Sequence, residues 1–176
     1  MRIVSGKYKG RLIRPPKKIN ARPTTDFAKE NLFNILETRI DFEDKEILDL
    51  FSGTGNMNYE FISRGSKTVL SIEKDFKHFQ FIKKIAGEFG MSNLRVKKGD
   101  VFKFLRSCTQ QFDIVFADPP YQLNNIEKIP ELVINKDILK ENGFLILEHS
   151  KYTDFSSNQH LYEHRKYGSV NFSFFK

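Results

Sequence analysis

Between residues 46 and 149 the chain alternates short apolar runs with segments of helix length. The apolar runs are "EILDLF", "TVLSIE", "LRVKK", "FDIVFAD" and "GFLILEH", and the segments between them span residues 56–65, 75–90, 100–108 and 125–143. Strands that alternate with helices at this spacing are typical of βαβ units. The pattern therefore predicts an α/β fold with a mostly parallel sheet and helices on both faces. With 176 residues the chain has room for one such domain.

The two ends of the chain depart from this alternation. Residues 26–37, "DFAKENLFNILE", follow two possible N-cap residues, Thr24 and Thr25, and carry an apolar stripe formed by Phe27, Leu32, Ile35 and Leu36. This segment predicts a helix that joins the N-terminal part to the sheet. Near the C-terminus, "HLYEHRKYGSVNFSFF" shows two β-like runs around Tyr167-Gly168-Ser169. We expect an antiparallel hairpin there, added to the edge of the parallel sheet.

The net charge of +7 is concentrated at the N-terminus. Residues 1–25 contain no acid and eight basic side chains, which are Arg2, Lys7, Lys9, Arg11, Arg14, Lys17, Lys18 and Arg22. The remaining residues sum to −1. Apolar Ile3, Val4, Leu12 and Ile13 favour a short β-hairpin over the alternative, a solvated basic tail. We therefore expect residues 1–24 to form a basic extension that binds a polyanion such as nucleic acid, and residues 25–176 to form the main domain.

Several common classes of protein are disfavoured by the composition. No apolar run approaches the roughly 20 residues that span a membrane, and the first residues lack the apolar core of a signal peptide. The single cysteine, Cys108, cannot form an internal disulfide. We expect a cytoplasmic monomer without a membrane partner, in which Cys108 is a structural thiol.

Glycines and acids stand where successive strands end. The first run ends in Asp49 and Phe51 and is followed by Gly53 and Gly55, Glu73 ends the second, and Asp100 and Val101 follow the third. In an open α/β sheet ligands bind outside these strand ends. The glycines allow a ligand close to the backbone, and an acid at Glu73 could accept the hydroxyl groups of a ribose. The pattern predicts a cofactor that contains a nucleoside, although the third glycine of the dinucleotide-binding motif is replaced by Asn58.

The fourth strand run ends in "DPPY", residues 118–121. Because a residue before proline is driven away from helical conformation, Asp118 should leave the strand extended. Pro119 and Pro120 carry no N–H, so we expect their carbonyls to remain available beside the Asp118 carboxylate. Two acceptors on a rigid loop suit a planar –NH₂ group, and Tyr121 offers a face on which a base can stack.

Together these motifs resemble the class I S-adenosylmethionine (SAM) methyltransferases that act on exocyclic amines. The segments "MRIVSGKYKGR", "RPTTDFAKENLFNIL", "LDLFSGTG", "SRG", "FDIVFADPPY" and "RKYGSVNFSFF" resemble the RsmD family in particular and in the same order. The resemblance implies a Rossmann-like fold, SAM around Asp49–Gly55, Glu73, Asp100 and Val101, and a catalytic loop at Asp118–Tyr121. It also marks Arg22–Asp26 as a family segment. The chain departs from the family pattern at "GTGNMNYE", where Asn56 and Asn58 replace small residues.

The resemblance also implies a reaction and a partner. RsmD enzymes methylate the N2 amine of one guanine in 16S ribosomal RNA, so the expected partner is small-subunit RNA or an assembling small subunit. The expected substrate-binding residues are Arg2, Lys7, Lys9, Arg11, Arg14, Arg22, Thr24, Arg165 and Tyr167, with Lys166 beside the last two.

Other interpretations are open at this point. The enzyme could methylate adenine N6 or a protein glutamine, could be an NAD-dependent oxidoreductase, or could bind RNA without catalysis. The string His160-Leu-Tyr-Glu163-His164 matches a zinc-protease motif. Because it reads as a strand, in which residues four apart lie about 13 Å apart, we expect no metal there.

Overall fold

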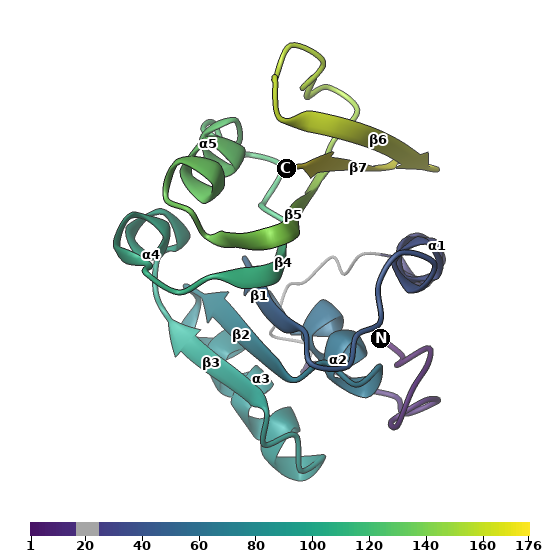
Figure 1. Ribbon diagram of the computed structural model, residues 1–176. Coiled ribbons are helices and arrows are strands. Elements are labelled where there is room, and N and C mark those ends of the chain that lie inside the picture. The colour runs from purple at the N-terminus through teal and green to yellow at the C-terminus, as the bar shows by residue number, and fades with distance from the viewer. Residues whose placement is uncertain (17–24) are drawn as a thin grey trace.

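The computed structural model describes residues 1–16 and 25–176, which form a seven-stranded sheet with five helices in the described ranges (Figure 1). The strands lie in the order β3-β2-β1-β4-β5-β7-β6. In chain order the elements are α1 (Asp26–Glu37), β1 (Glu46–Leu50), α2 (Asn56–Ser63), β2 (Thr68–Glu73), α3 (Phe76–Glu88), β3 (Leu94–Lys98), α4 (Val101–Ser107), β4 (Phe112–Ala117), α5 (Lys128–Asn135), β5 (Leu139–His149), β6 (Leu161–Tyr167) and β7 (Val170–Phe175).

The pairing of the strands confirms the predicted sheet. Strands β1 to β5 pair in parallel, whereas β7 pairs antiparallel with both β5 and β6. The side chains of α1, α2 and α3 share one apolar core with one face of the sheet, and those of α4 and α5 share a second core with the other face. From β1 the chain builds the sheet outward through β2 to β3 and then returns to the other side of β1 with β4. The carboxyl ends of β1 and β4 therefore flank a switch point, at which ligands commonly bind.

The prediction of a helix over residues 125–143 is wrong for the second half of that range. The helix ends as α5 at Asn135, and β5 begins at Leu139. Asp137 has a left-handed backbone, with φ of 51°, which stops the helix. Lys140 then forms ion pairs of 2.7 Å with Glu46 and 2.9 Å with Asp113, which tie the start of β5 to two neighbouring strands.

The expected apolar stripe of α1 is correct except at its start. Leu32 and Leu36 are buried and Ile35 is half-buried, but Phe27 is 63% exposed. Thr25 caps the helix by accepting a hydrogen bond from the N–H of Ala28 at 3.2 Å, as predicted. Thr24, the other possible cap, lies outside the described residues.

Residues 1–16 form an N-terminal segment with a single antiparallel bridge, between Arg2 and Leu12. The expected hairpin is therefore shorter than two regular strands. Its apolar residues Ile3, Tyr8 and Ile13 are buried, so the segment packs onto the main domain. Gly6 lies so close to α2 that an added Cβ would be 1.8 Å from the carbonyl oxygen of Ser63.

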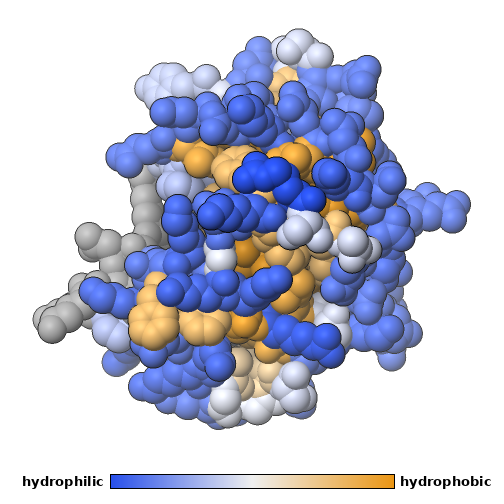
Figure 2. Space-filling model, turned by 90° about the vertical axis from the view of Figure 1, so that its left-hand side faces the viewer, coloured by the Kyte–Doolittle hydropathy of each residue, from blue (hydrophilic) through white to orange (hydrophobic). Residues whose placement is uncertain are grey.

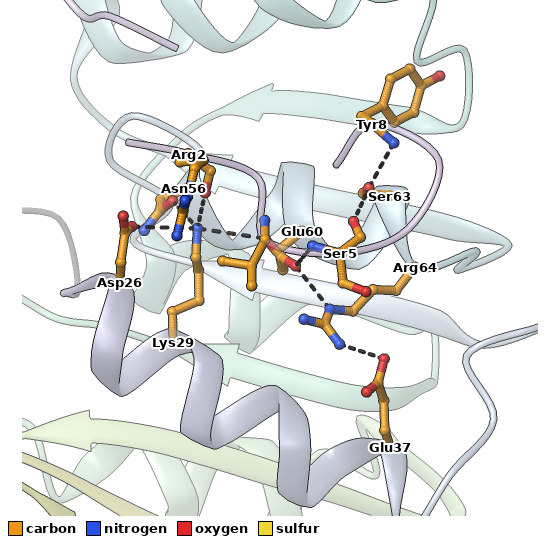
Figure 3. Close-up of polar contacts among 11 residues, drawn as sticks. Arg2, Ser5, Tyr8, Asp26, Lys29, Glu37, Asn56, Glu60, Ser63 and Arg64 are labelled. Atoms are coloured by element: carbon orange, nitrogen blue, oxygen red, sulfur yellow. Dashed lines mark hydrogen bonds and ion pairs between the residues drawn. The ribbon is translucent and has the colours of Figure 1, made fainter. Parts of the chain in front are cut away.

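A buried ion network fastens this segment to α1 and α2 (Figure 3). The carboxylate of Glu60 accepts hydrogen bonds from the N–H groups of Val4 and Ser5 at 2.8 and 3.0 Å, and from Arg64 Nε at 2.9 Å. The ammonium of Lys29 lies 3.5 Å from Glu60 Oε2 and donates to the carbonyl of Arg2 at 2.6 Å. Because Glu60 and Lys29 are fully buried, the three elements hold a fixed arrangement.

Candidate active site

A cleft of about 1130 Å³ lies outside the carboxyl ends of the strands. It brings together residues expected to bind the cofactor and the residues of the expected catalytic loop. They are Asp49, Phe51, Gly53, Glu73, Asp100, Val101, Asp118, Pro119, Pro120 and Tyr121. Figure 2 views the molecule from the side toward which β2 and β3 point in Figure 1, and shows apolar residues in the middle of that face within a hydrophilic border. The cleft is therefore apolar in part, with a small number of acids at defined positions.

The loop between β1 and α2 turns sharply beside the cleft. Phe51, Gly53 and Gly55 all have positive φ, at 59°, 52° and 81°. Gly53 has almost no neighbour near the position of a Cβ, so its backbone is open to a ligand. Gly55 does not line the cleft; an added Cβ there would lie 2.8 Å from the Tyr59 ring. The first glycine thus leaves room for a ligand, and the second leaves room for α2 to pack.

Asp49 is the buried acid at the end of β1. It is 1% exposed, lines the cleft, and its Oδ2 has no hydrogen-bond partner among the described residues. Burial raises the pKa of Asp49 well above its usual value, and the nearby charge of Glu73 raises it further, while a hydrogen bond with Ser52 opposes the shift. An unpaired buried carboxylate oxygen is costly, so this atom suits a donor supplied by a bound molecule.

Glu73 organises the next strand end. Its two carboxylate oxygens accept 2.7 Å hydrogen bonds from the N–H groups of Gly53 and Asp75, so this acid fastens the glycine loop as well as lining the cleft. His78 Nδ1 lies 3.9 Å from Glu73, and hydrogen bonding to Glu73 raises the pKa of His78. Each carboxylate oxygen has a further lone pair, so Glu73 can accept from a ligand while holding the loop.

Asp100 caps α4 on the same side of the cleft. Its side chain accepts a hydrogen bond from the N–H of Lys103 at 3.1 Å, and Lys74 Nζ lies 3.4 Å away. Val101, the next residue, is buried and lines the cleft beside Phe102. An apolar wall near Glu73, an acid that could accept from ribose hydroxyls, suits a nucleobase.

The loop after β4 forms the other side of the cleft. Asp118 is half-buried and follows the strand directly, Pro119 is buried, and Tyr121 is 54% exposed. The expectation that both proline carbonyls remain available is wrong for Pro120, whose carbonyl accepts the N–H of Leu123 at 2.9 Å. Among the described residues no hydrogen bond to the Pro119 carbonyl is formed, so the acceptors at the cleft are Asp118 and Pro119.

The two asparagines that depart from the family pattern are both buried in α2. Asn58 donates a 2.9 Å hydrogen bond to Ser71 Oγ, which ties α2 to β2. Asn56 lines the cleft and its Oδ1 accepts a 2.9 Å hydrogen bond from Lys29. The helix is therefore held to its neighbours by polar bonds at these two positions, and only Asn56 borders the ligand space.

The cleft also contains residues that were not expected as site residues from the sequence motifs, among them Thr25, His78, Phe102, Glu148, Ser169 and Val170. Glu148 carried the same signal as Glu73, because it is an acid near the end of an apolar run, and it is buried at the end of β5. Thr25 and the turn at Ser169 come from distant parts of the sequence. Nothing in the local pattern placed them at this cleft.

Those expected substrate-binding residues that the structure describes lie away from the cleft. Arg2, Lys7, Lys9, Arg11 and Arg14 are all exposed on the N-terminal segment, and none of them lines it. Arg165 is exposed on β6 and bonded to Glu163, and Tyr167 is half-buried with its ring 6.1 Å from that of Phe172. Arg22 lies outside the described residues, as does Thr24.

Two other properties were searched for within residues 1–16 and 25–176. No group of three acidic, histidine or cysteine side chains there could hold a metal ion. His160, Glu163 and His164 are among the side chains searched. No helix in those ranges is long and apolar enough to cross a membrane.

Comparisons with known proteins agree with this arrangement. The family model described as conserved hypothetical protein 95 matches residues 1–176. The putative rRNA methyltransferase YlbH of Bacillus subtilis is 31% identical over 155 residues, which cover 86% of this chain and 83% of that protein. Ribosomal RNA small subunit methyltransferase D of Escherichia coli K12 is 33% identical over 154 residues, which cover 88% of this chain and 74% of that protein.

The structure has a close counterpart among solved proteins. The putative methyltransferase yhhF from Escherichia coli superposes with a TM-score of 0.86 at 28% identity, covering 99% of this chain and 96% of that one. Fold, motif order and the full-length family match therefore agree, and the chain belongs to this family, the RsmD family of ribosomal RNA methyltransferases.

Proposed function

We propose that this protein transfers a methyl group from SAM to the exocyclic N2 amine of a guanine in small-subunit ribosomal RNA. The observation that carries the proposal is that one cleft contains both the glycine loop with Asp49 and Glu73 and the Asp118–Tyr121 loop. A nucleoside-binding region and a pair of acceptors for an amine therefore face the same space. The small-subunit methyltransferase D names of the relatives support the same class of substrate.

The residues at the β1–β3 side fit SAM. The open backbone at Gly53 and the unpartnered Oδ2 of Asp49 suit the charged methionine end of SAM, whose ammonium is a donor. Glu73 can accept from the ribose hydroxyls, and Val101 with Phe102 can contact the adenine. When bound, SAM supplies an electrophilic methyl group on its sulfonium.

The residues at the β4 side would prepare the amine. The N2 lone pair of guanine is delocalised into the ring, which makes the free amine flat and a weak nucleophile. Hydrogen bonds from its two N–H groups to the Asp118 carboxylate and the Pro119 carbonyl orient the nitrogen and favour a pyramidal geometry. Tyr121 stacks on the base. As the nitrogen gains the methyl group, it loses one proton to the Asp118 carboxylate or to water. Alignment with electrostatic stabilisation accounts for most of the rate gain.

The basic extension, residues 1–24, is proposed as the part that binds RNA. Its described side chains Arg2, Lys7, Lys9, Arg11 and Arg14 are exposed while Ile3, Tyr8 and Ile13 are buried, so the charges point to solvent from a fixed base. Arg165 with Tyr167, on the hairpin whose turn reaches the cleft at Ser169, forms a second proposed contact. A guanine inside a helix must be flipped out to enter the cleft.

The test is to incubate the protein with SAM carrying a labelled methyl group and with unmodified small-subunit RNA or particles. We expect label in one guanine, and digestion to nucleosides should yield N2-methylguanosine. Label in N6-methyladenosine would contradict the choice of guanine but keep the methyltransferase. Absence of transfer to RNA and to particles, with SAM bound, would contradict the function itself.

A further inference from the structure

The basic side chains of the body are unevenly distributed. Residues 26–73 and 107–176 together carry more acids than bases, whereas residues 74–106 contain nine Lys or Arg and only three Asp or Glu. All nine basic side chains are exposed. The near-neutral total of the body therefore conceals a second strongly positive region, which covers α3, the edge strand β3 and α4 (Figure 1).

Helix α3 also exposes aromatic rings. Phe76, Phe79, Ile82 and Phe89 recur near helical spacing in the sequence, but within the helix only Phe81, Ile82 and Ile85 are buried. Phe76 is 51% exposed, and its ring stacks at 6.3 Å on that of Phe79. Exposed stacked aromatics are unusual on an ordinary solvated helix face, and they are common where nucleic acid binds.

Basic side chains lie over each of these rings. Lys98 Nζ is 4.9 Å from the centre of the Phe76 ring, Lys83 Nζ is 5.6 Å from that of Phe79, and the Arg11 guanidinium is 4.6 Å from that of Phe89. We call Phe76, Lys77, Phe79, Lys83, Phe89 and Lys98 the α3 strip. The acids beside it are Glu73, which pairs with Lys98 across β2 and β3, Asp75, which caps the helix, and Glu88, which lies 3.6 Å from Lys84.

The α3 strip connects two regions described above. At one end Phe76 and Lys98 line the cleft. At the other end Phe89 stacks on Tyr8 of the N-terminal segment, with ring centres 6.2 Å apart and planes 18° apart. The 13 residues of α3 span about 20 Å, which is the length of several nucleotides. A positive, aromatic path thus runs from the basic N-terminal segment to the mouth of the cleft.

We propose that the α3 strip is an RNA-binding surface, along which the strand next to the methylated nucleotide passes between the N-terminal segment and the cleft. The lysines neutralise phosphates, and the exposed Phe76 ring offers a stacking face at the cleft end. This proposal rests on the proposed function, since it assigns a path to the same RNA substrate. The competing explanation is that the lysines only protect the edge strand β3 from pairing with another chain.

The test uses the full chain with Lys77→Gln and Lys83→Gln, two positions that do not line the cleft. The matched control carries Lys128→Gln and Lys136→Gln, which are exposed on α5 against the opposite face of the sheet. Binding of small-subunit RNA or particles is measured from 50 to 200 mM salt. Because each lost phosphate contact lowers the slope of log K against log salt by about 0.7 to 0.9, we expect a slope shallower by about 1.5 and an affinity at least about fivefold weaker in the α3 variant. SAM affinity should not change.

Three outcomes would overturn the proposal. The first is an unchanged slope of log K against log salt in the α3 variant, and the second is an equal loss of RNA affinity in the α5 control. The third is an α3 variant that binds RNA as the wild type does but self-associates, as the edge-protection explanation expects. In each case the wild-type protein still methylates its RNA, which separates this failure from that of the proposed function. A wild-type protein that transfers no methyl group to small-subunit RNA would instead refute the proposed function.

Discussion

Asp118 lies directly after β4 and directly before the proline pair. A carboxylate at that point is half-buried, lines the cleft and lies on a loop of restricted backbone freedom. We expect Asp118→Ala to lower kcat by about 100-fold or more, because an acceptor that orients the reacting amine is lost. The affinity for SAM should be retained, as measured by calorimetry.

The control for this change is Glu127→Ala. Glu127 is an exposed acid that precedes α5 and makes no side-chain hydrogen bond to cap it, so its removal should leave kcat within about twofold. An Asp118→Ala enzyme that methylates at the parental rate would refute the role proposed for Asp118.

Asp49 presents a conflict between stability and binding. Because burial raises its pKa, this carboxyl favours folding below its unfolded pKa of about 3.8, and that contribution is lost as the pH rises toward its folded pKa. Asp49→Asn removes the titration. The free variant should therefore gain stability relative to the wild type as the pH increases from 4 to 7, measured by urea unfolding.

The same substitution should weaken SAM binding by about tenfold or more, because a neutral amide replaces the oxygen that would meet the methionine ammonium. A variant whose stability relative to the wild type does not rise between pH 4 and 7, or that binds SAM equally well, would contradict this account of Asp49.

At this scale the sequence revealed which acids matter but not their partners. Asp49, Glu73, Asp100 and Asp118 could be found because each lies at or just after the end of a strand of a predicted parallel sheet, and such ends meet at one edge. That Glu73 would also bind the N–H of Gly53, or that Pro120 would lose its carbonyl to Leu123, depends on loop geometry that no local pattern encodes.

At the scale of elements, helix α1 contains a buried lysine that reads in the sequence as part of a polar face. Lys29 is 1% exposed and contacts Arg2, Asn56 and Glu60, which belong to the N-terminal segment and α2. We expect Lys29→Met to destabilise the fold by about 3 kcal/mol, because removing one partner leaves buried polar groups without a donor. The midpoint of urea unfolding measures the change.

Lys29→Arg should recover part of that loss, since it keeps the charge. The control is Lys67→Met: Lys67 is exposed and lies 3.7 Å from Glu46, so its removal should cost less than about 1 kcal/mol. Equal losses in Lys29→Met and Lys67→Met would show that the buried network does not stabilise the fold.

The elements themselves were largely predictable, and their faces were not. The period of the apolar residues located every strand and most helices, but it placed Phe27 in an apolar stripe although this ring is exposed, and it did not distinguish exposed Phe76 from buried Ile82. Aromatic residues at helical spacing fit a buried stripe and an exposed binding surface equally well. Only the tertiary packing separates the two.

At the scale of the whole molecule, the N-terminal segment is part of the folded unit. Ile3, Tyr8 and Ile13 are buried in the core of the main domain, and Glu60 depends on the backbone of Val4 and Ser5 for two of its hydrogen bonds. Deleting the segment would therefore damage the fold along with any RNA binding. The division of the chain at residue 24 is a proposal about function, and its test is to neutralise the exposed charges while keeping the backbone.

The whole cleft can be tested through its effect on stability. A ligand that binds only the folded state adds about 2.7 kcal/mol at 100 times its dissociation constant. For a domain of 176 residues that corresponds to an increase in Tm of roughly 5 to 10 °C. We expect SAM to produce such an increase in the wild type, and a much smaller one in Asp49→Asn at the same concentration. NAD should leave Tm unchanged, because the chain has Asn58 at the position of the third glycine of the dinucleotide-binding motif. A thermal shift with NAD equal to that with SAM would contradict the assignment of the cofactor.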